Sequence, residues 1–336
     1  MKLHFSFALM LFVASAANAQ QPLKAFDGNA TWKTSGVLFA PPAESDCHAI
    51  KDPSVVRFDG KWHVFCTLRG SKRTHATGYF QFKDWSDAPK ASLTVLPNYD
   101  GFFCAPQVFY FTPHKKWYLI CQAVANDWEP KYQPAFCTNT DVGNPDGWTK
   151  LKPLWDVKPP KVKSWLDFWI ICDEAKAHLF YTSMDGKMWR AETALAKFPH
   201  GWSEPVIALE GDVFEASHTY SLKGSGKFIT LIEAQNGHGW RYYKSYVADK
   251  LDGTWKPIAA EKDSAFASMK NVEQGSSKWT DAVSHGELIR ASHDEKLEVD
   301  PEALQFLIQG VLDADRRGKK YGDIPWRLGL LQRTAK

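Results

Sequence analysis

The feature that most constrains the fold of this chain is a hairpin plan that occurs five times. Each copy begins with a polar head, continues into an apolar strand, turns, and returns as a second strand. In the first copy Lys51-Asp52-Pro53 leads into Ser54-Val55-Val56, Asp59-Gly60 makes the turn, and residues 61–65 return. The heads lie at residues 52, 105, 167, 215 and 285. Their spacing suits a repeated unit of four short strands with loops.

Regularly spaced short strands without long amphipathic helices predict an all-β fold. Radial repetition of such units predicts a five-bladed β-propeller, with a pair of β-sandwiches as the alternative. The fifth hairpin is expected to return through residues 296–299. Residues 304–309 read as a further strand, or as the start of a helix after Pro301. A last strand near Trp326 is expected to complete a blade with residues 32–38, because open sheet edges are a liability.

The polar heads point to a shared site. In a propeller the innermost strand of each blade runs along the central axis, so its first residues line one mouth of the ring. The plan brings Asp52, Gln107, Asp167, Glu215 and His285 to that mouth. Taken singly, Asp52 is a turn former, Glu215 a solvated strand end and His285 a core histidine. Together, however, three carboxylates raise one another's pKa, and a protonated carboxyl beside an ionised one is the pair that glycoside hydrolysis uses.

The first nineteen residues have the pattern of a secretory signal peptide. Lys2 precedes an apolar run from residue 5 to 17, and Ala17-Asn18-Ala19 fits the cleavage rule. This predicts a signal peptide over residues 1–19 and one exported catalytic domain over residues 20–336, secreted to the extracellular space or the periplasm. An N-terminal membrane anchor is the alternative, and no later apolar run is long enough to cross a bilayer. Without Lys2 the formal charge of +3 becomes +2, which leaves no electrostatic footprint for nucleic acid.

The six cysteines do not read as a disulfide framework. An even number in an exported chain permits three bridges, but Cys66, Cys121 and Cys172 lie within apolar strands and there is no Cys-x-x-Cys pair. Buried cysteines of this kind are usually small hydrophobes. We therefore expect one disulfide at most and no zinc site, because the spacing of zinc ligands is missing.

Several strings of this chain, in order between about Trp32 and Gln332, resemble glycoside hydrolase family 62. These are Lys51-Asp52-Pro53-Ser54-Val55-Val56, Ala105-Pro106-Gln107-Val108-Phe109-Tyr110-Phe111, Asp167-Phe168-Trp169-Ile170-Ile171, Phe214-Glu215-Ala216-Ser217 and Ser284-His285-Gly286-Glu287. Members of the family are secreted α-L-arabinofuranosidases that act on arabinoxylan. The resemblance implies a five-bladed propeller, an inverting mechanism and a monomer without nucleic-acid or membrane partners.

The resemblance also implies a role for each site residue. Asp52 would be the general base, Glu215 the general acid, and Asp167 the residue that tunes and orients the acid. Lys51 would contact the arabinose, Gln107 would line the same pocket, and Tyr321 would stand in the xylan cleft. His285 matches a histidine associated with a structural calcium ion, although calcium prefers oxygen ligands.

One departure from the family pattern leaves alternatives open. The family commonly has Tyr-Arg-Ala before its Ala-Pro-Gln, whereas this chain has Phe102-Phe103-Cys104, so Phe103 replaces an arginine. A sugar-binding propeller that has lost activity is therefore one alternative. A related arabinanase or xylosidase of the family 43 type, which shares the propeller and the three carboxylates, is the other.

Overall fold

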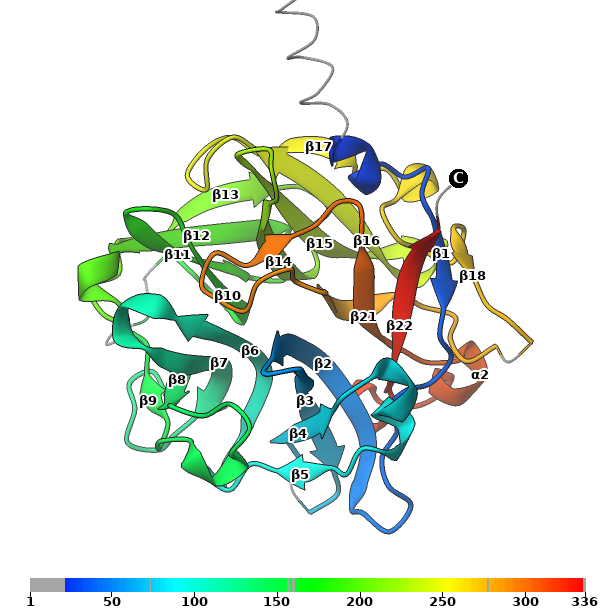
Figure 1. Ribbon diagram of the computed structural model, residues 1–336, viewed down its shortest axis with the longest axis horizontal. Coiled ribbons are helices and arrows are strands. Elements are labelled where there is room, and N and C mark those ends of the chain that lie inside the picture. Colours follow the sequence, from blue (N-terminus) through cyan, green and yellow to red (C-terminus); the bar gives the residue numbers. More distant parts are fainter. Residues whose placement is uncertain (1–21, 73, 156–157, 159–160, 277, 335–336) are drawn as a thin grey trace, which may run out of the picture.

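The computed structural model describes residues 22–334 except residues 73, 156–157, 159–160 and 277. Strands dominate this part of the chain and form five sheets around one axis (Figure 1). The predicted all-β five-bladed propeller is confirmed. The signal peptide predicted over residues 1–19 lies outside the described residues.

Among the described residues, no helix has both the length and the apolar character needed to cross a membrane. The helices of the described residues are short, and among them only α2 (Asp313–Arg316) is an α-helix. The others are short 3-10 helices: η1 (Pro22–Phe26), η2 (Trp85–Lys90), η3 (Thr112–His114), η4 (Pro145–Gly147), η5 (Leu195–Lys197), η6 (Lys262–Ser264) and η7 (Tyr321–Asp323).

The first four blades are antiparallel meanders that run outwards from the axis. Blade 1 contains β2 (Cys47–Phe58), β3 (Lys61–Gly70), β4 (Ala76–Phe82) and β5 (Thr94–Val95). Blade 2 contains β6 (Phe103–Phe111), β7 (Lys116–Val124), β8 (Tyr132–Asn139) and β9 (Lys152–Pro153). Blade 3 contains β10 (Leu166–Cys172), β11 (Lys176–Thr182), β12 (Lys187–Ala194) and β13 (Val206–Glu210). Blade 4 contains β14 (Glu215–Leu222), β15 (Lys227–Gly237), β16 (Gly239–Ala248) and β17 (Lys256–Ala259).

Blade 5 closes the ring with both ends of the described chain. Its strands from the axis outwards are β19 (Ser284–Leu288), β21 (Gln305–Gly310), β22 (Arg327–Thr334), β1 (Thr31–Thr34) and β18 (Val272–Glu273). The N-terminal β1 pairs antiparallel with the C-terminal β22, with Trp32 opposite Arg333. The predicted closure is therefore confirmed, and residues 304–309 form a strand rather than the start of a helix.

The prediction that residues 296–299 form the second strand of the fifth hairpin was wrong. β20 (Glu298–Val299) is only two residues long and pairs in parallel with Ser221 and Leu222 of blade 4. The strand that pairs with β19 is β21, because Leu288 lies opposite Phe306. The segment between β19 and β21 thus crosses to blade 4 before it returns to blade 5. The sequence analysis paired strands that are adjacent in the chain, so it could not predict this crossing.

A ring of hydrogen bonds joins the inner strands of neighbouring blades. No backbone ladder in the described residues links one inner strand to the next, so the buried main-chain groups there need other partners. A side chain from each inner strand bonds to the main chain of its neighbour. The five contacts are Ser54 Oγ with Val108 N at 3.0 Å, Gln107 with Ile170 N and O at 2.7 Å each, Trp169 Nε1 with Thr219 O at 2.7 Å, His218 Nδ1 with Gly286 O at 2.7 Å, and Glu287 Oε2 with Val55 N at 3.3 Å.

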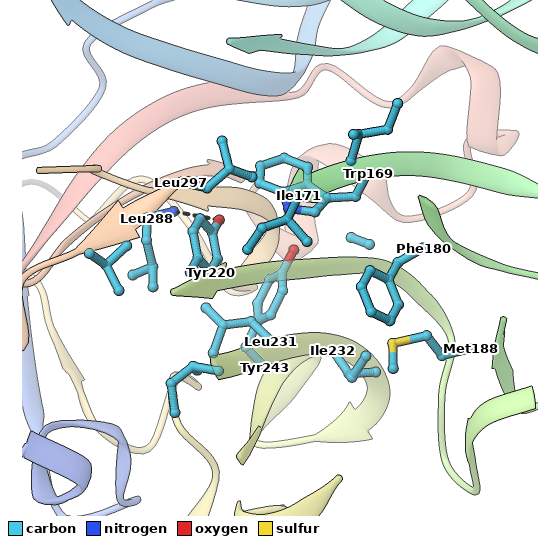
Figure 2. Packing of buried hydrophobic residues seen from close by; sticks show 14 of the residues in the cluster. Trp169, Ile171, Phe180, Met188, Tyr220, Leu231, Ile232, Tyr243, Leu288 and Leu297 are labelled. Carbon is cyan, nitrogen blue, oxygen red and sulfur yellow. Dashed lines mark hydrogen bonds between the residues drawn. The ribbon is translucent and has the colours of Figure 1, made fainter. Parts of the chain in front are cut away.

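The largest apolar cluster runs from blade 2 through blades 3 and 4 to blade 5. Figure 2 shows Trp169 and Phe180 of blade 3 packed toward Tyr220 and Tyr243 of blade 4. The hydroxyl of Tyr220 accepts a hydrogen bond of 3.0 Å from the amide of Leu288 in blade 5, so the two blades are tied together inside this core (Figure 2). All six cysteines are free thiols and five of them are buried, consistent with their expected role as small hydrophobes.

Candidate active site

A cavity of about 350 Å³ opens at the end of the propeller where the inner strands begin. We call it the mouth cavity. Its charged and imidazole lining comes from blades 1, 3, 4 and 5 and comprises Lys51, Asp52, Asp167, Glu215, Arg241, His285 and His75. Blade 2 contributes Cys104 and Gln122. The three predicted carboxylates, Lys51, Tyr321 and His285 are therefore brought together as the sequence suggested.

A β-bulge at the start of each inner strand aims these side chains into the mouth cavity. In blades 1 to 4 the pairing register skips two residues, and one residue of each bulge has positive φ: Asp52 at 47°, Ala105 at 48°, Asp167 at 55° and Ala216 at 52°. Such a bulge turns the strand and redirects a side chain. Aspartate tolerates left-handed φ better than most residues, which suits Asp52 and Asp167 to these places.

The bulges show that the five heads are not equivalent. Asp52 and Asp167 are the residues with positive φ in their blades, whereas Glu215 comes one residue before the corresponding Ala216. Glu215 therefore occupies the bulge position that Lys51 has in blade 1. In blade 2 the residue that corresponds to Asp52 is Ala105, so this blade brings no charged head to the mouth cavity.

The carboxylate of Asp52 is held in its ionised form. Its Oδ1 lies 3.5 Å from Lys51 Nζ and 3.4 Å from His285 Nδ1, and its amide donates to Gln309 Oε1 at 2.9 Å. Burial alone would raise the pKa of Asp52, but Lys51, His285 and a hydrogen bond from Thr67 together bring that pKa below its ordinary value. Burial in the same way favours neutral Lys51, but Asp52 and Tyr321 raise the pKa of the lysine, so both members of the pair stay charged.

Asp167 and Glu215 form a second group in the mouth cavity. A carboxylate oxygen of each and a ring nitrogen of His285 all lie within 4.8 Å of one another. The amide of Ala216 donates to Asp167 Oδ2 at 3.1 Å, which ties Asp167 to the strand that carries Glu215. Burial and the nearby charge of Glu215 hold the pKa of Asp167 well above its ordinary value. Two carboxyl groups this close cannot both ionise easily, so the pair holds a proton.

Arg241 and Glu233 were missed by the sequence analysis. Arg241 Nη1 lies 3.0 Å from Glu215 Oε1 and 2.9 Å from Glu233 Oε1, so one guanidinium is shared between two buried carboxylates. Burial and Glu233 raise the pKa of Glu215 to about 7, and Arg241 opposes them. Glu233 also accepts from the amide of His285 at 2.9 Å. Both residues lie within apolar strands at no repeat head, so only the charge itself could have drawn attention to them.

Gln107 and Phe103 do not reach the mouth cavity. Gln107 is fully buried, and its side-chain amide donates to the carbonyl of Ile170 and accepts from the N–H of the same residue. It therefore joins blade 2 to blade 3. Phe103 packs into the apolar core of blade 2, and its neighbours Phe102 and Cys104 line the cavity instead. The substrate contact predicted for Gln107 does not fit this position. The replacement of an arginine by Phe103 likewise removes no group from the cavity wall.

Tyr321 stands at the rim of the mouth cavity with 47% of its surface exposed. Its hydroxyl lies 3.4 Å from Lys51 Nζ, and the loop that carries it is fixed to blade 1. The carbonyl of Gly322 accepts from Arg69 Nη2 at 3.1 Å and lies 2.8 Å from His48 Nε2. A Cβ at position 322 would come within 2.3 Å of Arg69 Nη2, so a larger residue there would move the guanidinium.

The fold and the cavity together define a class of protein. A five-bladed propeller that gathers an ionised carboxylate and a proton-holding carboxyl pair at one mouth has the equipment of a glycoside hydrolase. The sequence comparison is more specific: the model of glycosyl hydrolase family 62 matches residues 31–332. The chain belongs to that family, and the predicted resemblance is confirmed.

Relatives with the same fold support this assignment. The α-L-arabinofuranosidase C of Cellvibrio japonicus is 37% identical over 308 residues, which are 90% of this chain and 46% of the relative, so the chain spans about half the length of that curated relative. The crystal structure of an α-L-arabinofuranosidase from Podospora anserina, in complex with cellotriose, is 37% identical with a TM-score of 0.85, and the match covers 93% of this chain and 99% of that one. A family 62 hydrolase in complex with xylotriose is 34% identical, also with a TM-score of 0.85, over 93% and 100% of the two chains.

Proposed function

We propose that this protein is a secreted, inverting α-L-arabinofuranosidase that removes arabinofuranosyl side groups from arabinoxylan. One observation carries the proposal: the mouth cavity holds both an ionised Asp52 beside Lys51 and the proton-holding pair of Asp167 and Glu215. Inverting hydrolysis needs one carboxylate to activate water and one carboxylic acid to protonate the leaving oxygen. Membership of family 62, and relatives named as arabinofuranosidases, support the choice of sugar.

The proposed reaction is a single displacement at the anomeric carbon. Asp52 accepts a proton from a water molecule as the water oxygen forms its bond to that carbon. Glu215 donates its proton to the glycosidic oxygen as the bond to the xylose unit breaks. The reaction leaves Asp52 protonated and Glu215 ionised, and exchange with solvent restores both. Because the water attacks the face opposite the leaving group, the released arabinose has the inverted anomeric configuration.

The surrounding residues orient the two groups. Lys51 keeps Asp52 ionised and offers its ammonium to a sugar hydroxyl, since it lines the same cavity. Asp167, tied to the amide of Ala216, stays next to the acid and shares the proton of the pair. The exposed ring of Tyr321 at the rim is placed to contact the xylan backbone outside the cavity. The family 62 relative in complex with xylotriose supports a xylose chain as the backbone.

A structural calcium ion near His285 remains part of the proposal and has no step in the reaction. The ligand atoms of Asp167, Glu215 and His285 lie within 4.8 Å of one another, so the donors suit a divalent ion in kind. Calcium takes six to eight oxygen ligands, however, and these residues provide too few without water. An ion bound by all three would also occupy the acid. A calcium ion compatible with the reaction would therefore be held by His285 and water, where it would add positive charge to the wall of the cavity.

The test of the proposed function is a product analysis on wheat arabinoxylan. The protein should release free arabinose, and proton NMR during the first minutes should show the inverted anomer before mutarotation. Linear arabinan should release much less. Cleavage of linear arabinan without release from arabinoxylan would contradict the proposal, and initial formation of the retained anomer would contradict the mechanism. Size-exclusion chromatography with light scattering checks the expected monomer, and secretion is checked by locating the mature protein after expression of residues 1–336.

A further inference from the structure

A second cavity, of about 420 Å³, lies at the other end of blade 2. We call it the blade-2 cavity. Lys116 opens β7 and lines this cavity, whereas Gln122, six residues later on the same strand, lines the mouth cavity. Six residues of a strand span about 20 Å. The blade-2 cavity is therefore separate from the proposed reaction and shares no lining residue with the mouth cavity.

The floor of the blade-2 cavity is aromatic. Strand register places Phe136 opposite Lys152 and Tyr118 opposite Thr138, so these side chains share one face of the blade 2 sheet. The rings of Tyr118 and Phe136 stack with their centroids 5.8 Å apart. His200, from the loop that follows η5 in blade 3, covers the opposite side and meets the ring of Phe136 edge-on at 6.2 Å. The floor thus offers aromatic surface against which the apolar face of a sugar ring can pack.

The rim of the blade-2 cavity is basic and contains no acidic residue among its lining. Lys116, Lys152, His114 and His200 surround the opening, and the first two are exposed without an ion-pair partner in the described residues. Two other lysines, in contrast, have acidic partners: Lys223 lies 2.7 Å from Asp300 and Lys296 lies 2.9 Å from Glu174.

His114, two residues before Lys116, adds a neutral imidazole to the rim. His114 Nδ1 lies 2.7 Å from the hydroxyl of Tyr118, which fixes the ring and leaves Nε2 for another partner. Burial and Lys116 lower the pKa of His114, so the imidazole is neutral and the two lysines provide the charge.

We propose that the blade-2 cavity binds a uronic acid residue of an acidic polysaccharide. Lys116 and Lys152 would pair with the carboxylate, and the pyranose ring would pack against the aromatic floor of Tyr118 and Phe136. A cationic rim above an apolar floor suits a ligand that carries both a negative charge and an apolar ring face. The site would hold an acidic cell-wall polymer on the face of the propeller away from the reaction.

The test compares two double variants that remove the same charge. In Lys116→Ala/Lys152→Ala the basic rim is lost. In Lys83→Ala/Lys90→Ala two exposed lysines of blade 1 are lost, which have no ion-pair partner among the residues that the structure describes. Binding of glucuronosyl-xylotriose and of neutral xylotetraose is measured by calorimetry at low salt, with inorganic phosphate as a competitor. The mouth cavity is unchanged in both variants, so any binding there is common to them. Activity on 4-nitrophenyl arabinofuranoside serves as the check on folding, and its presence or absence tests the proposed function separately.

The wild type should bind the acidic saccharide at least fivefold more tightly than the neutral one. The rim variant should lose this difference, and the blade 1 variant should keep it. Equal affinity of the wild type for the two saccharides, or equal loss in both variants, would overturn the proposal. Displacement by phosphate at the same concentration as the saccharide would also overturn it, because the cavity would then bind anions without contact to the sugar ring.

Discussion

Two groups of buried charge lie near the axis of this propeller, and they are built in opposite ways. The first is an ion pair of Glu287 and Arg290, which we call the axial ion pair. Arg290 Nε lies 2.7 Å from Glu287 Oε1, and Arg290 Nη2 donates to the carbonyls of Val55 and Val108 at 2.8 Å each. One acid and one base are thus matched, and their remaining bonds tie blade 5 to blades 1 and 2.

The mouth cavity leaves its charges unmatched. Asp52, Asp167 and Glu215 share a space with Lys51 and with Arg241, which also serves Glu233. The left-handed backbone at Asp52 and Asp167 costs about 1–3 kcal/mol each. The comparison distinguishes buried charges that stabilise the fold from buried charges that are available for the proposed reaction. The axial ion pair is neutralised by its own partner, whereas the mouth cavity keeps one carboxylate ionised and one carboxyl protonated.

The largest effect should come from the two carboxyl groups assigned to proton transfer. Asp52→Asn and Glu215→Gln are each expected to lower kcat on arabinoxylan by about 10³-fold, in line with the loss of a general base or acid. The melting temperature of Glu215→Gln should stay close to that of the wild type, because Arg241 keeps Glu233 as its partner. Asp52→Asn removes the ion-pair partner of buried Lys51 and should lower the melting temperature. Activity assays and thermal melts on purified variants measure both quantities.

The leaving group separates the two roles. A 4-nitrophenolate needs no proton to depart, so Glu215→Gln should lose much less activity on 4-nitrophenyl arabinofuranoside than on arabinoxylan. Asp52→Asn should lose the same factor on both substrates. If Asp52→Asn were the variant rescued by the good leaving group, the assignment of base and acid would be reversed.

The axial ion pair should show the opposite pattern. Arg290→Leu leaves Glu287 buried beside an apolar side chain, and breaking a buried pair in this way costs about 3–5 kcal/mol of stability. Urea denaturation measures the loss, and the kcat of the protein that remains folded should be unchanged. The double variant Arg290→Leu/Glu287→Leu should be more stable than Arg290→Leu alone. A double variant that is less stable than the single one would show that the carboxylate is held mainly by Ser54 and Val55 rather than by the arginine.

The pH dependence of kcat should show which carboxyl group carries the proton. Burial and Glu233 raise the pKa of Glu215 to about 7, so the acid loses its proton, and the rate falls, as pH rises through about 7. The pKa of Asp52 lies below its ordinary value, so the base stays ionised down to below about pH 4. The profile on arabinoxylan should therefore have a plateau between these limits. A rate that still increases from pH 7 to 9 would contradict Glu215 as the acid.

The sequence was sufficient to predict the ring of five blades but not the local geometry of the inner strands. Alternating strands and repeat heads predicted five blades, and Trp32 and Trp326 predicted the closure. The bulges could not be seen, because a shift of the pairing register depends on both strands. For that reason the sequence analysis placed Gln107 in the mouth cavity, although the residue of blade 2 that corresponds to Asp52 is Ala105. Arg241 and Glu233 were missed because they come from β16 and β15, which meet the cavity only after the sheet has formed.

The smallest predicted effects come from removing one tyrosine hydroxyl at the mouth cavity and, for comparison, one in the buried core. Tyr321→Phe keeps the ring at the rim but removes the oxygen 3.4 Å from Lys51 Nζ. One such bond contributes about 0.5–1.5 kcal/mol, which corresponds to a loss of about two- to tenfold in kcat/KM. Tyr220→Phe removes the acceptor of the buried Leu288 amide, so it should lower stability by about 1–3 kcal/mol and leave kcat/KM unchanged. If both variants lowered kcat/KM, or both lowered stability, the distinction between mouth-cavity residues that serve the reaction and buried residues that serve stability would not hold.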